Sequence, residues 1–368
     1  MLRLSLAFAA LGLLAVASGC APTPVDGLDL ETDEIETSAL ANDDPAKLLV
    51  YTTNLENLAT STVAAGDPEL CRGDWQDLFY FMANDGRAPD VVLVQQVTDE
   101  AQLDGKLIAK MEELFGEEYG SIIAEKSPSY WAEADCSAKH YQTNAIVYRK
   151  ARLRYAQGSK RTWSSQVADG DACVTAPASR YVNVAAKFED VLRPHGNALA
   201  EVAVGSVHWP VKDGCGVTNA KDASAMMESY TGAQLWIFGG DMNLPEFEAP
   251  AKPASGWRAW YDRTNVSLGA PDTLGWVDPV YEACVAANAD ETAVGQCLVA
   301  NGTMRSKARY DYLFARYKPS YRGDRAVTSA PITVDPVVAG QADQAMTGSD
   351  RAELAYSMHR AVGAYFHW

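Results

Sequence analysis

The hydrophobic residues of this chain fall into short runs typical of buried strands, separated by stretches in which apolar residues recur at helical spacing. DVVLVQQV (residues 90–97) is almost continuously apolar, whereas Ile108, Met111 and Phe115 recur as they would on one face of a helix. The pattern predicts strands at residues 47–54, 90–97, 145–148, 181–188, 198–208, 235–241, 308–315 and 361–366. It predicts helices at residues 69–84, 101–115 and 222–230.

The order of these elements indicates a fold class. Several strands follow one another without an intervening helix, which favours an α/β protein with two largely antiparallel sheets over a doubly wound parallel sheet. Residues 155–179 and 245–305 lack clear periodicity, and we expect long loops or insertions there that shape a substrate site. No internal repeat is visible, which argues against a solenoid or a propeller.

Residues 1–20 have the features of an export signal. Arg3 precedes an apolar run at residues 4–16 that is too short to span a bilayer comfortably. The sequence Ala-Ser-Gly-Cys that follows resembles a bacterial lipobox, in which Cys20 would be lipidated, although Ala17 stands where Leu is usual. An ordinary cleaved signal with a chance cysteine is the alternative. We expect a bacterial cell-envelope lipoprotein, held at the outer membrane or cell surface by a lipid anchor.

The charge of the chain is strongly negative and partly local. Its formal net charge is −17, and residues 21–46 contain eight acidic residues and no Lys or Arg. We interpret this segment as a flexible tether, too polar to bury a core, and residues 47–368 as a single domain. The domain keeps a net charge of about −10. An acidic body does not attract polyanions, which disfavours a high-affinity nucleic-acid binder but not a hydrolase that meets phosphate through a cation.

Six cysteines remain beyond the export signal, an even number that indicates disulfides in an exported protein. They are Cys71, Cys136, Cys173, Cys215, Cys284 and Cys297. We expect a Cys284–Cys297 disulfide, which closes a short loop, and the sequence leaves the other pairings open.

Polar residues with catalytic chemistry accompany the predicted strands, and we place them at the carboxyl ends. They are Asn54, Gln95, Gln96, His208, Asp241 and Asn243, to which we add Asp311 and His359. A rigid sheet core can hold such side chains so that they converge on one cleft.

The segments that carry these residues look like a known series of motifs. They are VYTTNLEN, PDVVLVQQV, YQTNAIVYR, SRYVNVAAKF, SVHWP, FGGDMN, RYDYLFA and YSMHRAVGAYF. In this order, over residues 47–368, they resemble the motifs of the endonuclease/exonuclease/phosphatase superfamily, the DNase I-like metal-dependent phosphodiester hydrolases. The resemblance implies a four-layer α/β/β/α sandwich of two mostly antiparallel sheets.

The resemblance also implies roles for individual residues. Asn54, Asp241 and Asn243 would hold the scissile phosphate and the attacking water. His359, oriented by Asp311, would be the general base or a transition-state donor. A further group of residues would face the phosphate or orient the loops around it: His208, Asn144 and Arg180.

Two positions depart from the family pattern and affect the expected metal. Gln96 stands where the family has a metal-binding Glu, and Met358 where it has an Asp before the terminal His. Both changes remove negative charge from the site of a divalent metal, which the resemblance implies to be Mg²⁺, a cation that prefers anionic oxygen ligands. Glu56 is a candidate to replace part of the lost charge, and Gln96 still offers an amide oxygen.

These features support two main functions. The first is a monomeric, divalent-metal-dependent phosphodiesterase or nuclease, with nucleic acid, a lipid head group or a small molecule as substrate. The second is a non-catalytic binding descendant of the family, motivated by Gln96 and Met358. A purely structural surface lipoprotein would leave the ordered series of polar residues unexplained.

Overall fold

The fold is described from a computed structural model, in which all described residues belong to one unit, Ala39–Trp368. They are residues 44, 46–56, 58, 75–84, 88–132, 140–211, 214–245, 247–249, 252–253, 276–288, 290–304, 308–318, 331–334 and 359–367. The expected signal, the lipidation site Cys20, nearly all of the tether, and Cys71, Cys136 and Met358 lie outside the described residues.

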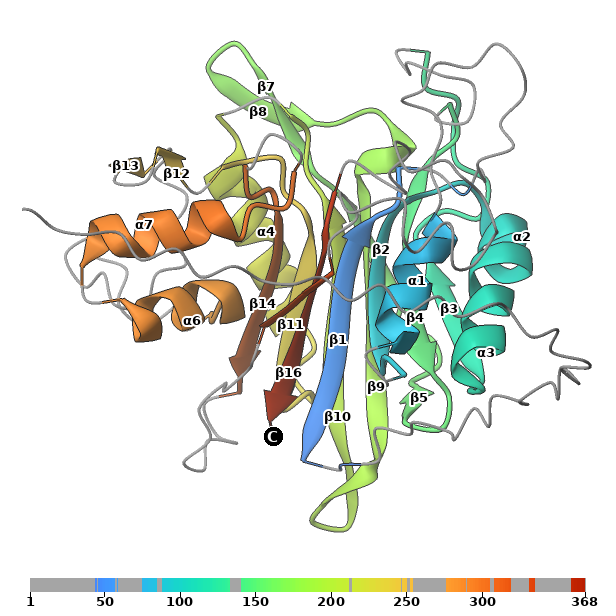
Figure 1. Cartoon of the computed structure of the whole chain (residues 1–368). Coiled ribbons are helices and arrows are strands. Elements are labelled where there is room, and N and C mark those ends of the chain that lie inside the picture. Colours follow the sequence, from blue (N-terminus) through green and yellow to red (C-terminus); the bar gives the residue numbers. More distant parts are fainter. Residues whose placement is uncertain are drawn as a thin grey trace, which may run out of the picture. The chain divides into compact units, whose positions relative to one another are not determined.

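Two large sheets form the centre of the described structure (Figure 1). The first has the strand order β15 (Pro331–Val334), β16 (Ala361–His367), β1 (Lys47–Asn54), β2 (Val91–Val97), β4 (Thr143–Arg149), β3 (Tyr119–Ile123). The second has the order β14 (Asp311–Tyr317), β11 (Leu235–Asp241), β10 (Ala198–His208), β9 (Val182–His195), β5 (Leu153–Tyr155), and β6 (Arg161–Ser164) also pairs with β9. Within these sheets only β1 with β2 and β10 with β11 pair in parallel, so the prediction of two mostly antiparallel sheets is confirmed.

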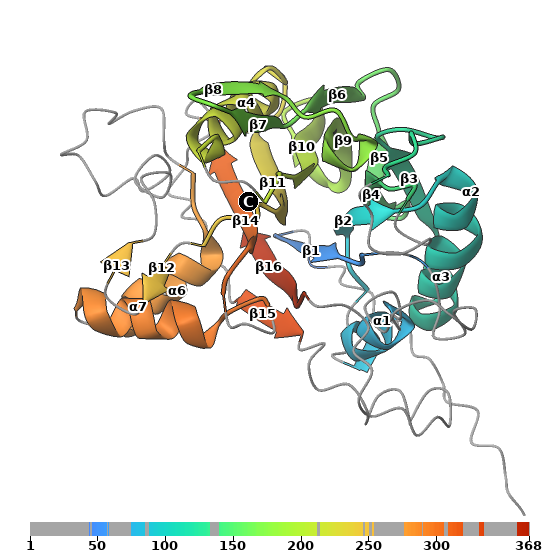
Figure 2. The same cartoon turned by 90° about the horizontal axis from the view of Figure 1, so that it is seen from above.

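Helices cover the outer faces of the two sheets (Figure 2). The first sheet is covered by α1 (Trp75–Asn84) and by one continuous helical stretch of α2 (Glu100–Gln102), a π-helical turn (Leu103–Ile108) and α3 (Ala109–Phe115). The second is covered by α4 (Gly216–Glu228). Together these elements give the four layers of an α/β/β/α sandwich.

Alternation of side chains explains why the strands read as continuous apolar runs. In β1, Leu48 and Val50 point into the core between the sheets, whereas Leu49 and Tyr51 pack against α1 and α3. Successive residues of a strand face opposite sides. Because both sides of these strands are covered, both sets of side chains are apolar and buried.

Local signals fix where several helices begin and end. The side chain of Asp99 accepts a hydrogen bond from the backbone N–H of Gln102, which caps the start of α2. Gly116, with φ at 66°, ends α3 in the left-handed conformation that glycine adopts without strain. Within the described residues, no helix is both long enough and apolar enough to cross a lipid bilayer.

The two segments expected to be loops contain regular elements, so that prediction was wrong in part. Residues 155–179 contain β6 and a hairpin of β7 (Gln166–Asp169) and β8 (Ala172–Thr175). Residues 245–305 contain β12 (Phe247–Ala249), β13 (Lys252–Pro253), α6 (Pro279–Ala287) and α7 (Glu291–Ala300). The hairpin strand β8 is exposed throughout, so burial imposes no alternating pattern on its sequence.

Disulfides and caps stabilise these elements instead. Cys173–Cys215 joins the hairpin to the start of α4, and Cys284–Cys297 joins α6 to α7, as expected from the sequence. Asp278 and Asp290 cap α6 and α7 through their side chains. A 13-residue separation between bonded cysteines stabilises a helix pair by restricting the unfolded chain, without any apolar periodicity.

Candidate active site

The candidate site lies at one edge of the two sheets, where strand ends from both meet. The parallel pairs β1/β2 and β10/β11 end together, with Asn54 opposite Gln95 and His208 opposite Asp241. The antiparallel strand β14 begins at this edge, which sets Asp311 opposite Asp241. His359 precedes β16, the antiparallel neighbour of β1. The expectation that these side chains converge holds, but Asp311 begins a strand and His359 precedes one, so these two do not lie at carboxyl ends.

Two glycines allow β11 to carry Asp241 between its neighbours. A Cβ on Gly240 would collide with the carbonyl oxygen of Val207 on β10. A Cβ on Gly239 would lie 2.7 Å from the carbonyl oxygen of Tyr312 on β14. The Gly-Gly pair before Asp241 is therefore required for the backbone to pass closely enough to place that carboxylate at the edge.

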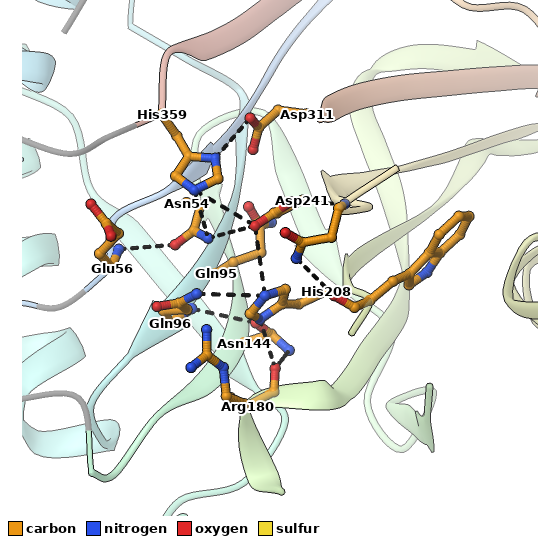
Figure 3. A network of polar contacts seen from close by, with 12 residues as sticks. Asn54, Glu56, Gln95, Gln96, Asn144, Arg180, His208, Asp241, Asp311 and His359 are labelled. Atoms are coloured by element: carbon orange, nitrogen blue, oxygen red, sulfur yellow. Dashed lines mark hydrogen bonds and ion pairs between the residues drawn. The ribbon is translucent and has the colours of Figure 1, made fainter. Parts of the chain in front are cut away.

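His359 and Asp311 form a buried hydrogen-bonded pair. Nδ1 of His359 lies 2.9 Å from Oδ2 of Asp311, and both residues are almost fully buried. A carboxylate at Nδ1 fixes the tautomer and the plane of the ring, so that Nε2 faces the site. Figure 3 shows Asp311 on one side of the imidazole and Asn54 and Asp241 on the other.

Asp241 is the centre of the polar network. Its Oδ2 accepts a hydrogen bond of 2.9 Å from Nδ2 of Asn54, and its Oδ1 accepts one of 2.9 Å from the backbone N–H of Asn243. The same Oδ2 lies 3.7 Å from Nε2 of His359 and 3.6 Å from Nε2 of His208. One carboxylate oxygen thus accepts a hydrogen bond from the Asn54 amide and lies close to two imidazoles, and these three groups lie on or next to three different strands.

The buried charges shift the pKa values of this network. Burial raises the pKa of Asp241 to about 6, even though the charge of His359 and the hydrogen bond from Asn54 lower it. Burial lowers the pKa of His359, but the charges of Asp311 and Asp241 outweigh it and raise that pKa to about 10. Near neutral pH, His359 is therefore an imidazolium beside an ionised Asp241.

His208 has the opposite electrostatic character. Burial, together with the charges of Arg180 and His359, holds its pKa well below the usual range. Its Nδ1 lies 3.0 Å from the carbonyl oxygen of Arg180, which requires the proton on Nδ1. Nε2 is then an acceptor, and Nε2 of Gln96 lies 3.5 Å from it. His208 is a neutral imidazole with its acceptor nitrogen in the site.

Asn144 holds neighbouring strands together at the site. Its Nδ2 donates to the carbonyl oxygens of Arg180 and Val182, at 2.9 Å and 2.8 Å, and its Oδ1 accepts from the backbone N–H of Gln96 at 3.4 Å. These bonds use both amide hydrogens within the protein.

The guanidinium of Arg180 lies over the ring of Trp131, 4.1 Å from its centroid, which orients the Arg180 side chain beside His208.

Two residues that support the site, Ser206 and Asn183, were not predicted from the sequence. Nε2 of Gln95 donates to Oγ of Ser206 at 3.0 Å, and Ser206 Oγ donates to the carbonyl of Val94, which joins the two sheets below Asp241. Oδ1 of Asn183 accepts from the backbone N–H of His208. A polar residue inside an apolar run, such as Ser206, was the available signal, because buried polar groups need partners.

Strained backbone is concentrated at this edge. Within the described residues, the non-glycine residues with positive φ are Glu56 at 58°, Gln96 at 61° and Asn243 at 51°. They follow or end β1, β2 and β11. A positive φ is costly for most residues and persists at functional sites where the surroundings hold it.

The side chains at this site offer the kinds of ligand atom that bind divalent cations. Asp241, Asp311 and His359 have ligand-type atoms that all lie within 4.8 Å of one another, and the two carboxylates can offer oxygens while His359 is protonated. Oδ1 of Asp311 is buried and accepts no hydrogen bond from the described residues. Glu56 and Gln96, both buried, add a carboxylate and an amide oxygen, and Glu56 interacts electrostatically with His359. Oxygen donors of this type suit Mg²⁺. The Glu56 carboxylate and the neutral Gln96 amide together supply less negative charge than two carboxylates would.

Comparison with solved structures identifies the class of fold. The catalytic domain of human nocturnin, determined with a bound sulfate, aligns at 12% identity and a TM-score of 0.50, over 88% of this chain and 95% of that one. An endonuclease/exonuclease/phosphatase from Bacteroides vulgatus aligns at 14% identity and 0.48, over 87% and 98%. A humanized D. rerio TDP2 aligns at 13% and 0.48, over 88% and 100%. Neither the family models nor the curated protein sequences give a match.

The chain therefore has the DNase I-like fold of the endonuclease/exonuclease/phosphatase proteins, as its motifs predicted. At these identities the likeness describes the fold, and the chemistry of this chain has to be argued from its own residues.

Proposed function

We propose that this chain is a divalent-metal-dependent phosphodiester hydrolase, tethered to the bacterial cell envelope through a lipid on Cys20. The observation that carries the proposal is the buried His359–Asp311 pair, whose imidazole faces Asp241 and Asn54. Phosphodiester hydrolysis needs a group that takes a proton from water and donors that stabilise charge on phosphate. The site supplies an imidazolium held by a carboxylate, an ionisable carboxylate and a neutral amide donor around one point.

The pKa values divide the work between the two main groups. Asp241, with a pKa of about 6, is ionised at neutral pH and basic enough to take a proton from an attacking water. His359, with a pKa of about 10, is protonated and acts as a hydrogen-bond donor to a phosphate oxygen rather than as a base. Asn54 orients Asp241 through its amide.

The residues proposed to hold the metal are Glu56 and Gln96, beside Asn54. When bound, a divalent cation would compensate the charge of the phosphate oxygens. The acidic composition of the chain favours small phosphodiesters or lipid head groups over long polynucleotides as substrates, because nothing attracts a polyanion at long range.

An activity screen of the purified protein tests this proposal. The substrates are bis(4-nitrophenyl) phosphate, DNA and sphingomyelin, each with Mg²⁺, Mn²⁺ or Ca²⁺ and with a chelator as the control. Metal-dependent hydrolysis of at least one is expected. If none is cleaved with any metal, the hydrolase proposal fails.

A bell-shaped dependence of kcat/KM on pH is expected. The rate should rise as pH passes about 6, where Asp241 loses its proton, and fall as pH approaches about 10, where His359 loses its own. Hydrolysis of bis(4-nitrophenyl) phosphate at constant ionic strength measures the profile. Asp311→Asn removes one of the charges that raise the pKa of His359 and should move the descending limb to lower pH. A wild-type rate that stays constant to high pH would assign His359 the role of a neutral base.

Gln96 favours one alternative function, a non-catalytic descendant that binds phosphate compounds in the same site. The amide replaces a metal carboxylate, so the native protein would bind a cation weakly. Calorimetry with Mn²⁺ separates the two functions. Clear binding that is lost in Glu56→Ala, which removes the carboxylate proposed to hold the metal, argues against the alternative.

Restoring the carboxylate should strengthen metal binding. Gln96→Glu adds a negative charge to a buried site, and we expect the Kd for Mn²⁺ to fall about tenfold or more. The exposed Gln157→Glu adds the same charge on the surface and serves as the matched control. An equal effect of both changes would mean that Gln96 does not face the cation.

A further inference from the structure

One buried residue, Thr303, contacts both chain segments that carry the His359–Asp311 pair. Its Oγ1 accepts hydrogen bonds from the backbone N–H groups of Tyr310, at 2.9 Å, and Asp311, at 3.0 Å. Its carbonyl oxygen accepts a bond of 2.7 Å from the backbone N–H of Arg360, next to His359. Thr303 is only 1% exposed, so these bonds do not compete with water.

This placement matters because the pair spans the two sheets. Asp311 begins β14 of the second sheet, and His359 leads into β16 of the first. No β-ladder joins β14 to β16, so the pairing of strands does not fix the distance between the two side chains. Thr303 joins the segments directly, and Met304 forms a β-bridge with His359 itself.

A braced helix pair holds Thr303 in place. The chain leaves α7 through a tight turn, in which the backbone N–H of Gly302 donates to the carbonyl of Val299. The Cys284–Cys297 disulfide ties α7 to α6.

The start of α6 is anchored to β14 as well. Asp278 forms a buried ion pair of 2.6 Å with Arg309. Arg309 lies two residues before Asp311, the first residue of β14. Val277 and Ala315 exchange two backbone hydrogen bonds of 2.8 Å and 2.9 Å. The segment from Val277 to Thr303 is therefore fixed to β14 at both of its ends.

We propose that Thr303 is a positioning residue that sets the geometry of the His359–Asp311 pair, supported by the disulfide-braced helices α6 and α7. The hydroxyl oxygen of Thr303 accepts a hydrogen bond from the backbone N–H of Asp311. Its carbonyl oxygen accepts one from the backbone N–H of Arg360, the residue after His359. Loss of the hydroxyl acceptor leaves the buried N–H of Asp311 and the partly buried N–H of Tyr310 without their partner and lets the start of β14 move relative to His359. The kinetic part of this inference rests on the proposed hydrolase function, whereas the geometric part does not.

Three full-length variants test the kinetic part. Thr303→Val keeps the shape but removes the acceptor, and it should lower kcat by about 10- to 30-fold with KM changed less than about twofold, because small misplacements of catalytic groups are costly. Thr303→Ser keeps the acceptor and should stay within about threefold of wild type. Thr162→Val, at an exposed position of β6, is the matched control and should leave both constants unchanged. Equal loss in the Val and Ser variants would overturn the role of the hydroxyl.

A second measurement does not depend on activity. The proton on Nδ1 of His359 should give a downfield NMR signal in wild type and in Thr303→Ser, assigned by its loss in His359→Gln. In Thr303→Val the signal should shift or broaden. An unchanged signal would overturn the proposal. If wild type hydrolyses nothing, the hydrolase function fails on its own, and the signal still decides the role of Thr303.

The helix support gives a third test that remains available if Thr303→Val does not fold. The double variant Cys284→Ser/Cys297→Ser removes the brace behind Thr303 and leaves the hydroxyl in place. Circular dichroism checks that the variant is folded, and its His359 signal should broaden. A sharp, unshifted signal in the folded double variant would show that the helix pair does not support the site and would overturn that part of the proposal.

Discussion

Replacing His359 with alanine is expected to lower kcat for phosphodiester hydrolysis by about 10³-fold, with little change in KM. The change removes the imidazolium that faces Asp241 at 3.7 Å and leaves the carboxylate of Asp311 buried without its partner. The lost interaction forms with the charge that develops on phosphate during the reaction, so kcat falls rather than binding. Steady-state kinetics on bis(4-nitrophenyl) phosphate measures both constants.

A double-variant cycle makes this expectation sharper. Asp311→Asn keeps the shape but weakens the support of the ring, and it should lose nearly as much activity as His359→Ala. Because the two residues act as a unit, the double variant should be no worse than the poorer single variant. His195→Ala, on the exposed end of β9, is the matched control. Additive losses would contradict a functional pair.

Replacing Asp90 with alanine should destabilise the fold by about 3–5 kcal/mol, because it leaves the buried guanidinium of Arg149 without its main counter-charge. Oδ1 of Asp90 accepts bonds from Nε and Nη2 of Arg149, at 3.1 Å and 2.8 Å, and Oδ2 accepts the backbone N–H of Leu49 at 2.8 Å. Both charged side chains are at most 1% exposed. Urea unfolding at neutral pH gives the change in free energy of unfolding.

Two comparisons separate this buried pair from ordinary surface charge. Glu100→Ala removes an exposed ion pair with Lys126 and should cost less than about 1 kcal/mol. Asp90→Ala combined with Arg149→Met removes both buried charges, and stability should recover much of the loss. If the double variant were as unstable as Asp90→Ala, the hydrogen bond to Leu49 rather than the unpaired charge would explain the effect.

Local pattern predicted the central strands well because both faces of these strands are buried. β1, β10 and β11 have the bounds expected from the sequence, and the other predicted strands differ at one or both ends. The sequence missed β3 and the short strands β5 and β15, as well as the helices α6 and α7. Those helices depend on side-chain caps, a disulfide and the Asp278–Arg309 pair, interactions that leave no periodic signal.

The candidate site was predicted in composition but only in part in arrangement. The motif series named Asn54, Asp241, Asp311 and His359, and the structure brings all four together. The motif series could not show that the amide hydrogens of Asn144 bond to the backbone. Their acceptors are the carbonyl oxygens of Arg180 and Val182, which lie 36 and 38 residues away in the sequence. Backbone acceptors have no signature in a sequence.

The sequence by itself determined which central strands are buried on both faces and which chemical groups are available near their ends, because the apolar run of a strand and the identity of each side chain are local properties. The tertiary structure alone decided that His359 is charged while His208 is neutral, since burial affects both imidazoles and only His359 has Asp311 at its Nδ1. It also decided that Thr303 joins the segments that bear Asp311 and His359. Distances across two packed sheets depend on the whole core, and no local stretch of sequence encodes them.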